Sequence, residues 1–264
     1  MCLLPHPLYE KARRMTAKEL ENESDSDLLN SYYYISGTFK FDDNVKYPCI
    51  AADLPKVGPG PLISIYPKSG SCAITGCEYL LAKKMNCNFT ISEVIKIPTK
   101  NEKEKEKEGT KPFKRIMEVL QAERRKHPKG SLLNVLYKLF GNGGYGILCR
   151  GFSDKRSFDI ESGSTKRMPA NDISNIILGG QTTALARCVI GECLHNIHVL
   201  GGAVVSATTD GFITDIDNLE ERILKSDKAG ISRTFLELYR ETRKMLSGDS
   251  SALELKTSVK GLIS

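Results

Sequence analysis

The spacing of apolar residues changes partway along the chain, and this change constrains the fold more than any other feature. From Tyr32 to about Ile97, apolar residues alternate with polar ones or form short runs between Gly, Pro and Asn, which is typical of β-strands. From Phe113 onward they recur every three or four residues, which is typical of amphipathic helices. Residues 1–30 are polar and are also predicted to be helical. Helices packed on an antiparallel sheet give the α+β class.

Two helices are predicted in the middle of the chain. The sequence PFKRIMEVLQAERRKHPKG indicates one helix that ends at His127-Pro128 and Gly130. SLLNVLYKLF indicates a second helix, with Ser131 as its N-cap. A short turn makes the two helices an antiparallel hairpin. Its inner surface carries four basic residues: Arg124, Arg125, Lys126 and Lys138.

The C-terminal part is predicted to hold two helices and a strand hairpin. Residues 182–198 have helical spacing, and one last amphipathic helix covers residues 219–246. Between them, GGAVVSATTDGFITDI predicts strand, tight turn and strand, because β-branched residues flank Asp210-Gly211, a strong turn dipeptide. Residues 147–180 are rich in loops.

The composition is that of an intracellular globular protein with a mild basic excess. Thirty-eight Lys and Arg against 32 Asp and Glu give a formal charge of +6, which is compatible with a polyanionic partner. No secretory signal precedes the eight cysteines, so reduced thiols are expected. No stretch approaches the roughly 18 apolar residues of a membrane span, so no membrane partner is expected. The alternating charges of residues 101–109 indicate a solvated tip or a linker.

The stretch KLFGNGGYG, residues 138–146, carries the first candidate binding residues. Lys138, Asn142 and Tyr145 are spaced i, i+4 and i+7, so a helix stacks them in one row. An ammonium, an amide and a phenol ring suit a nucleotide, and glycines let another chain approach closely. The alternative is that Lys138 is a solvated surface residue and that the glycines terminate the helix.

Asp210 is the next candidate. A carboxylate at the tip of a hairpin on a rigid sheet is well placed to hold Mg²⁺ against a substrate phosphate, although most Asp-Gly turns hold nothing. A zinc-binding alternative uses the segment CVIGECLHNIH, although its spacing matches no zinc pattern and it continues an apolar helical run. Its four potential ligands are Cys188, Cys193, His195 and His198.

The order and spacing of these signals resemble the palm and fingers of family B DNA polymerases, most closely the protein-primed group of viruses, phages and organellar linear plasmids. The family's fingers motif is Lys, three residues, Asn, a small residue, any residue, Tyr and Gly. Residues 138–146 match it, with Gly143 in place of the usual Ser. A basic residue stands twelve positions before the motif's lysine in the family, as Lys126 does in this chain. Upstream, residues 75–78 resemble the family's Thr-Gly-x-Glu pattern.

Two further motifs match downstream. The family's pattern of Thr, two residues, Gly or Ala, and Arg, which touches the primer strand, corresponds to Thr183, Ala186 and Arg187. Its catalytic hairpin has two aspartates around a Thr. Asp210 matches the second, metal-binding aspartate, and Thr208 replaces the first.

The resemblance implies a DNA-directed DNA polymerase that extends a primer 3′-hydroxyl by two-metal catalysis with Mg²⁺ or Mn²⁺. It implies primer-template DNA and deoxynucleoside triphosphates as partners and, if synthesis is protein-primed, a terminal priming protein. The implied catalytic residues are Asp210, which would also be the metal ligand, and Lys138. The implied nucleotide-binding residues are Lys126, Lys138, Asn142, Tyr145 and Gly146. The implied DNA-binding residues are Thr183, Ala186 and Arg187.

The resemblance also implies four regions. Residues 1–110 would be the N-terminal part of the palm with surface loops, and residues 111–146 the fingers hairpin. Residues 147–180 would be an insertion-like loop region, and residues 181–264 the palm with the catalytic hairpin, ending before the thumb.

The first palm motif, with its metal-binding Asp, is expected to be missing, as are the exonuclease and the thumb. Asp215 and Asp217 on the returning strand are candidate substitutes for the missing carboxylate. We therefore expect an incomplete polymerase that extends primers weakly or not at all by itself. The first alternative is a non-catalytic, nucleic-acid-binding relic of such a polymerase, which accommodates Thr208. The second is an unrelated zinc-binding α+β protein.

Overall fold

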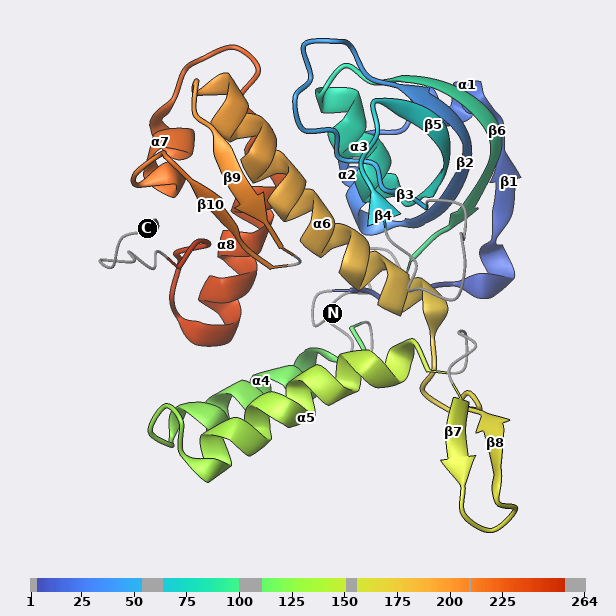
Figure 1. The fold of residues 1–264 in the computed structure, drawn as a ribbon. Helices are drawn as coiled ribbons and strands as arrows, with labels where there is room; N and C mark the ends of the chain where they lie inside the picture. The colour runs from blue at the N-terminus through green and yellow to red at the C-terminus, as the bar shows by residue number, and fades with distance from the viewer. Residues whose placement is uncertain (1–3, 54–63, 100–110, 151–155, 209, 255–264) are drawn as a thin grey trace.

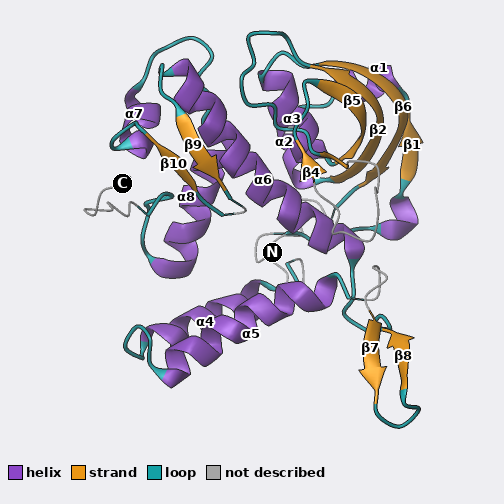
Figure 2. Cartoon of the chain, viewed as in Figure 1, coloured by secondary structure: helices purple, strands orange, loops and turns teal. Residues whose placement is uncertain are grey.

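The chain forms an antiparallel sheet with packed helices, so the predicted α+β class is confirmed. The computed structural model describes residues 4–53, 64–99, 111–150, 156–208 and 210–254 of the 264-residue chain. Figure 2 shows that helices make up most of the C-terminal half, whereas the large sheet lies entirely in the N-terminal half.

The main sheet has four antiparallel strands in the order β1-β6-β2-β5. The central strand β2 (Tyr32–Lys40) pairs with β5 (Ser69–Ile74) and with β6 (Asn88–Ile97), and β1 (Arg13–Met15) pairs with the other edge of β6. The sheet curves around the helix α3 (Gly76–Lys84) (Figure 1). Every residue of α3 from its first position through Ala82 is buried, so the main hydrophobic core lies between the sheet and this helix.

The N-terminal 30 residues and the loops of the sheet differ from the prediction. Besides the strand β1, the described residues 4–30 contain a 3-10 turn, η1 (Tyr9–Lys11), and the short helices α1 (Ala17–Glu21) and α2 (Asp25–Asn30). Two of the predicted strands shrink to the two-residue pair β3 (Ala52–Asp53) and β4 (Ser64–Ile65). The predicted charged linker at residues 101–109 lies outside the described residues.

The long helix α6 (Ile176–Val199) connects the parts of the molecule (Figure 1). It begins six residues earlier than the predicted helical segment, with the side chain of Asn175 as its N-cap. Its Ala184 and Cys188 belong to the core under the sheet. Its Cys193 and Ile197 belong to a second hydrophobic cluster with the C-terminal helices. The helix α6 therefore contributes residues to both hydrophobic clusters.

The C-terminal segment contains the predicted strand hairpin but not one continuous helix. The strands β9 (Val204–Ala207) and β10 (Phe212–Thr214) are antiparallel, as expected. The predicted helix over residues 219–246 is instead two helices, α7 (Leu219–Lys225) and α8 (Thr234–Ser247). The Arg233 guanidinium donates hydrogen bonds to the carbonyl oxygens of Ile223 and Ser226 at the end of α7. These bonds satisfy the end of the first helix and turn the chain into the second.

The predicted helical hairpin is confirmed. It consists of α4 (Lys114–Arg125) and α5 (Leu132–Leu148), which lie side by side and project from the body of the molecule (Figure 1). The Ser131 side chain caps α5, as predicted, by accepting the N–H of Asn134. A small strand hairpin, β7 (Arg156–Asp159) and β8 (Ser164–Arg167), projects nearby.

Candidate functional site

The glycine-rich stretch is helical throughout, because α5 continues to Leu148. The alternative in which the glycines terminate the helix is therefore wrong. Lys138 and Asn142 are exposed on α5, and Tyr145 is half-buried. A Cβ added at Gly143 or Gly146 would meet no atom within 4 Å. A glycine inside a helix costs about 1 kcal/mol relative to alanine, so these glycines lower the stability of α5 and leave its surface without side chains at these positions.

Tyr145 joins α5 to α6. Its hydroxyl lies 2.5 Å from the Oγ1 of Thr183, 38 residues later in the sequence. The Thr183 hydroxyl donates its own proton to the carbonyl of Gly179, at 3.1 Å. Because a hydroxyl has a single proton, the Tyr145 hydroxyl must be the donor to Thr183. The structure thus brings together one residue of the Lys-Asn-Tyr motif and one residue of the Thr-x-x-Ala-Arg motif.

Arg187 joins α6 to α3. Its Nε and Nη2 atoms donate to Oε1 of Glu78, at 3.0 and 2.7 Å. Thr183 and Arg187 are spaced i, i+4, so they share one face of α6. Ala186 is exposed beside them. One helical turn of α6 therefore contacts both the projecting hairpin and the helix under the sheet.

Lys126 lies at the far end of the hairpin from these contacts. It is the C-cap of α4, and its Nζ forms an exposed ion pair with Glu123 at 2.6 Å. The hydrogen bond to Glu123 raises the pKa of the lysine, so the lysine is protonated at neutral pH. Lys138 lies six residues after the start of α5 at Leu132, or roughly 9 Å along the helix axis. The two lysines therefore belong to different helices of the same hairpin.

Asp210 is exposed in the turn between β9 and β10. Thr208 closes this turn, because its backbone N–H and its hydroxyl both donate to the carbonyl of Gly211, at 2.8 and 3.1 Å. In Figure 1, the turn end of this hairpin points toward the side on which α4 and α5 lie. Asp215 and Asp217 are also exposed. Oδ1 of Asp215 accepts the N–H of Ala203 at 2.7 Å, so this oxygen supports the base of the hairpin.

The described residues do not fit a complete two-metal centre. In the described part of the chain, no group of three or more His, Cys, Asp or Glu side chains is arranged to hold a metal ion. Two bridged Mg²⁺ ions need more carboxylate oxygens than Asp210 supplies.

The zinc alternative also lacks convergent ligands. The side chains of Cys188 and Cys193 are buried in different hydrophobic clusters. The Nε2 atom of His195 contacts the carbonyl of Gly230 at 3.0 Å, and that of His198 contacts the carbonyl of Asn44 at 3.1 Å. Each histidine is thus occupied with a different segment of backbone.

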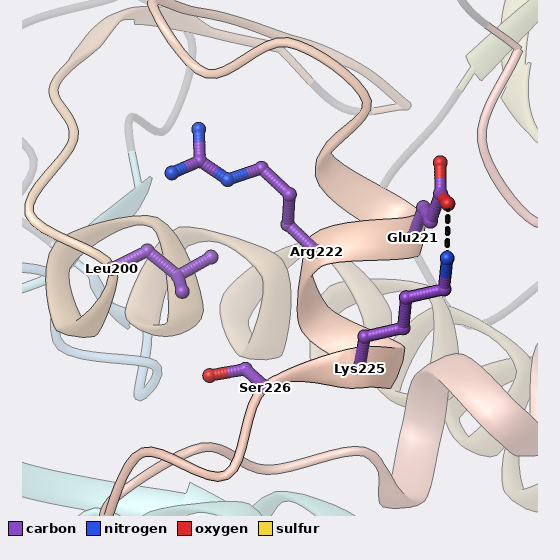
Figure 3. A pocket seen from close by; sticks show the side chains of 5 residues that line it. All are labelled: Leu200, Glu221, Arg222, Lys225 and Ser226. Carbon is purple, nitrogen blue, oxygen red and sulfur yellow. Dashed lines mark hydrogen bonds and ion pairs between the residues drawn. The ribbon is translucent and has the colours of Figure 1, made fainter.

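One surface pocket lies beside α7. It is lined by side chains of α7 and of the loops next to it, with an exposed ion pair between Glu221 and Lys225 at one side (Figure 3). An exposed pair of this kind contributes little to binding or stability. None of the residues predicted from the sequence to bind nucleotide, DNA or metal lines this pocket. No helix in the described ranges is both long and apolar enough to cross a membrane.

The fold has its match among DNA polymerases. The structure of phi29 DNA polymerase with primer-template DNA and incoming nucleotide has a TM-score of 0.50 to this chain at 13% identity, covering 83% of this chain and 37% of that one. The binary complex of the same polymerase gives 0.48 at 14% identity, covering 83% and 36%. In sequence, the chain is 29% identical over 227 residues to the primer-independent DNA polymerase PolB of Escherichia coli. No protein-family model matches.

These comparisons confirm the resemblance to protein-primed family B DNA polymerases that the motifs predict. The match covers 86% of this chain but only 25% of the E. coli protein, so the chain spans about a quarter of that relative's length.

Proposed function

We propose that this chain supplies the nucleotide-binding and primer-binding surfaces of a DNA-directed DNA polymerase. The observation that carries the proposal is the hydrogen bond between Tyr145 and Thr183. It joins α5, which carries the Lys-Asn-Tyr motif, to α6, which carries the Thr-x-x-Ala-Arg motif. A nucleotide and a primer end must lie next to each other during polymerisation, and a direct contact between the two motifs suits that requirement.

The projecting hairpin would bind the deoxynucleoside triphosphate. Lys138 and Lys126 carry exposed positive charges that suit phosphate oxygens. Tyr145, with the open surface at Gly146, would face the new base pair, and its hydroxyl is already fixed by Thr183. Asn142, one turn after Lys138, would hydrogen-bond the sugar or support this surface.

The exposed face of α6 would bind the primer strand. Arg187 is half-exposed and Ala186 is exposed and small, so a sugar-phosphate backbone can approach there. Backbone contacts of this type position DNA without reading its sequence. A terminal priming protein would be a further partner if synthesis is protein-primed.

A divalent cation, Mg²⁺ or Mn²⁺, enters this proposal only through Asp210. Its exposed carboxylate at the tip of a strand hairpin is a suitable single ligand. Since the described residues do not form a two-metal centre, we assign no step of the reaction to a metal held by this chain alone.

A primer-extension assay tests the proposal. The purified 264-residue chain, given Mg²⁺, primer-template DNA and all four deoxynucleoside triphosphates, is expected to bind the DNA and to extend the primer weakly or not at all. Robust extension would show that the chain holds a complete catalytic centre, contrary to the account of Asp210. Absence of any DNA binding would contradict the proposed surfaces themselves.

A second candidate function is a non-catalytic DNA-binding relic of such a polymerase. The observation that favours it is Thr208, which closes the β9–β10 turn with its hydroxyl where the polymerase family has an aspartate. The relic and the polymerase differ in whether DNA binding responds to a nucleotide that pairs with the template.

A further inference from the structure

Arg187 has only part of its guanidinium occupied. A guanidinium carries five N–H donors in a rigid fork. One on Nε and one on Nη2 are directed to Glu78. The second N–H on Nη2 and both on Nη1 remain, and 37% of the side chain is exposed. Glu78 therefore holds one side of the guanidinium, and the remaining donors belong to a side chain that is partly exposed.

Glu78 is a fixed tether. Its side chain is only 4% exposed. Its Oε2 atom accepts the backbone N–H and the hydroxyl of Thr75, each at 3.0 Å, in a capping box at the start of α3. The positive end of the α3 dipole further stabilises the carboxylate. Because Oε2 is held in this way, the orientation of the carboxylate is fixed, and Oε1 accepts the N–H groups of Arg187 from a defined position.

We infer that Glu78 is a positioning residue for the primer strand, because it orients Arg187 so that the remaining guanidinium donors take a phosphate oxygen. This inference rests on the proposed function. Glu78 itself touches no DNA. A guanidinium held at two of its N–H groups offers the others in a defined plane, which suits a phosphate better than a freely rotating ammonium does.

The competing explanation is that Glu78 serves only to cap α3. The chain offers a matched control for that role, because Thr16 and Glu19 form the same capping box at α1. Glu19 also accepts a hydrogen bond from an arginine, Arg13, but this pair is exposed and contains no residue of the proposed site. Loss of a cap alone should therefore have the same consequence at both positions.

The test is the affinity for a primer-template duplex, measured by fluorescence anisotropy for the full chain, with circular dichroism as the check on folding. Arg187→Ala is expected to weaken binding about tenfold, as for one lost charged phosphate contact. It should also lower the slope of log affinity against log salt by about one. Glu78→Gln is expected to weaken binding about fivefold, and Glu19→Gln to leave it unchanged. Glu78→Gln combined with Arg187→Ala should bind no more weakly than Arg187→Ala alone.

Two results would overturn the inference while leaving the primer contact intact. One is wild-type affinity in Glu78→Gln while Arg187→Ala is impaired. The other is that Glu78→Gln lowers the affinity by the same factor in the wild type and in Arg187→Ala. Additive effects of this kind would mean that the two residues act independently. If Glu78→Gln does not fold, Arg187→Lys replaces it, since it keeps the charge but loses the fork, and it should bind as weakly as expected for Glu78→Gln. Wild-type affinity in Arg187→Ala would remove the primer contact of the proposed function and this inference with it.

Discussion

Replacing Gly143 and Gly146 together by alanine is expected to stabilise the protein and to weaken its binding of a deoxynucleoside triphosphate. Both glycines lie inside α5, where alanine is better by about 1 kcal/mol per position, and an added Cβ meets no atom within 4 Å. The free energy of unfolding should therefore rise by about 2 kcal/mol. The same two methyl groups would occupy the surface proposed to face the new base pair, so nucleotide affinity should fall by about tenfold or more.

The measurements are denaturant unfolding and a nucleotide titration of the DNA complex. Gly180→Ala is the matched control, since Gly180 lies inside α6 and also has open space around it. It should stabilise by about 1 kcal/mol and leave nucleotide affinity unchanged. A double alanine variant that binds nucleotide as well as the wild type would show that the bare surface of α5 has another purpose.

Replacing Glu192 by alanine is expected to lower the free energy of unfolding by about 3 kcal/mol or more. The Glu192 side chain is fully buried on α6. It accepts the backbone N–H groups of Phe235 and Leu236, at 2.9 and 2.7 Å, and the hydroxyl of Ser232. Alanine would leave these donors buried without a partner, at about 1–3 kcal/mol for each lost bond. Denaturant unfolding measures the loss. The exposed Glu221→Ala on α7 is the control and should change stability by no more than about 0.5 kcal/mol.

The same carboxylate should give a pH dependence of known sign. Burial raises the pKa of Glu192, against hydrogen bonds from Ser232 and from the start of α8 that lower it. A raised folded pKa means that the stability contributed by this group is fully present below its unfolded pKa, about 4.3. That contribution is lost as the pH rises through the folded value. The stability of wild type relative to Glu192→Gln should therefore decrease from pH 4 toward pH 7, and an increase would contradict a raised pKa.

Local patterns in the sequence predict the β9–β10 and α4–α5 hairpins, but little of what these hairpins contact. The pairing of β9 with β10, the hairpin of α4 and α5 and the cap at Ser131 all follow from neighbours within a few residues, and each is confirmed. The helix α3 is not predicted, although its capping box, Thr75 with Glu78, is a readable signal. Its apolar residues are buried all round, which removes the amphipathic period.

The contacts that organise the site join residues far apart in the sequence. Glu78 and Arg187 are 109 residues apart, and Tyr145 and Thr183 are 38 apart. Each residue belongs to a segment that resembles the polymerase family, but no spacing rule indicates which segments meet. The break between α7 and α8 is missed in part for the same reason. Besides the bonds of Arg233 to the end of α7, the start of α8 is held by hydrogen bonds to the buried Glu192, more than 40 residues earlier.

Whether a template-matched nucleotide tightens the DNA complex distinguishes a polymerase site from a surface that only binds DNA. The full chain is titrated with a primer-template duplex whose primer ends in a dideoxynucleotide, so that no chemistry occurs, in the presence of Mg²⁺. If the hairpin binds the nucleotide and α6 binds the primer, the complementary triphosphate should raise DNA affinity several-fold, and a mismatched triphosphate should not. Equal affinity with either nucleotide and with none would mean that the chain grips DNA without a polymerase site.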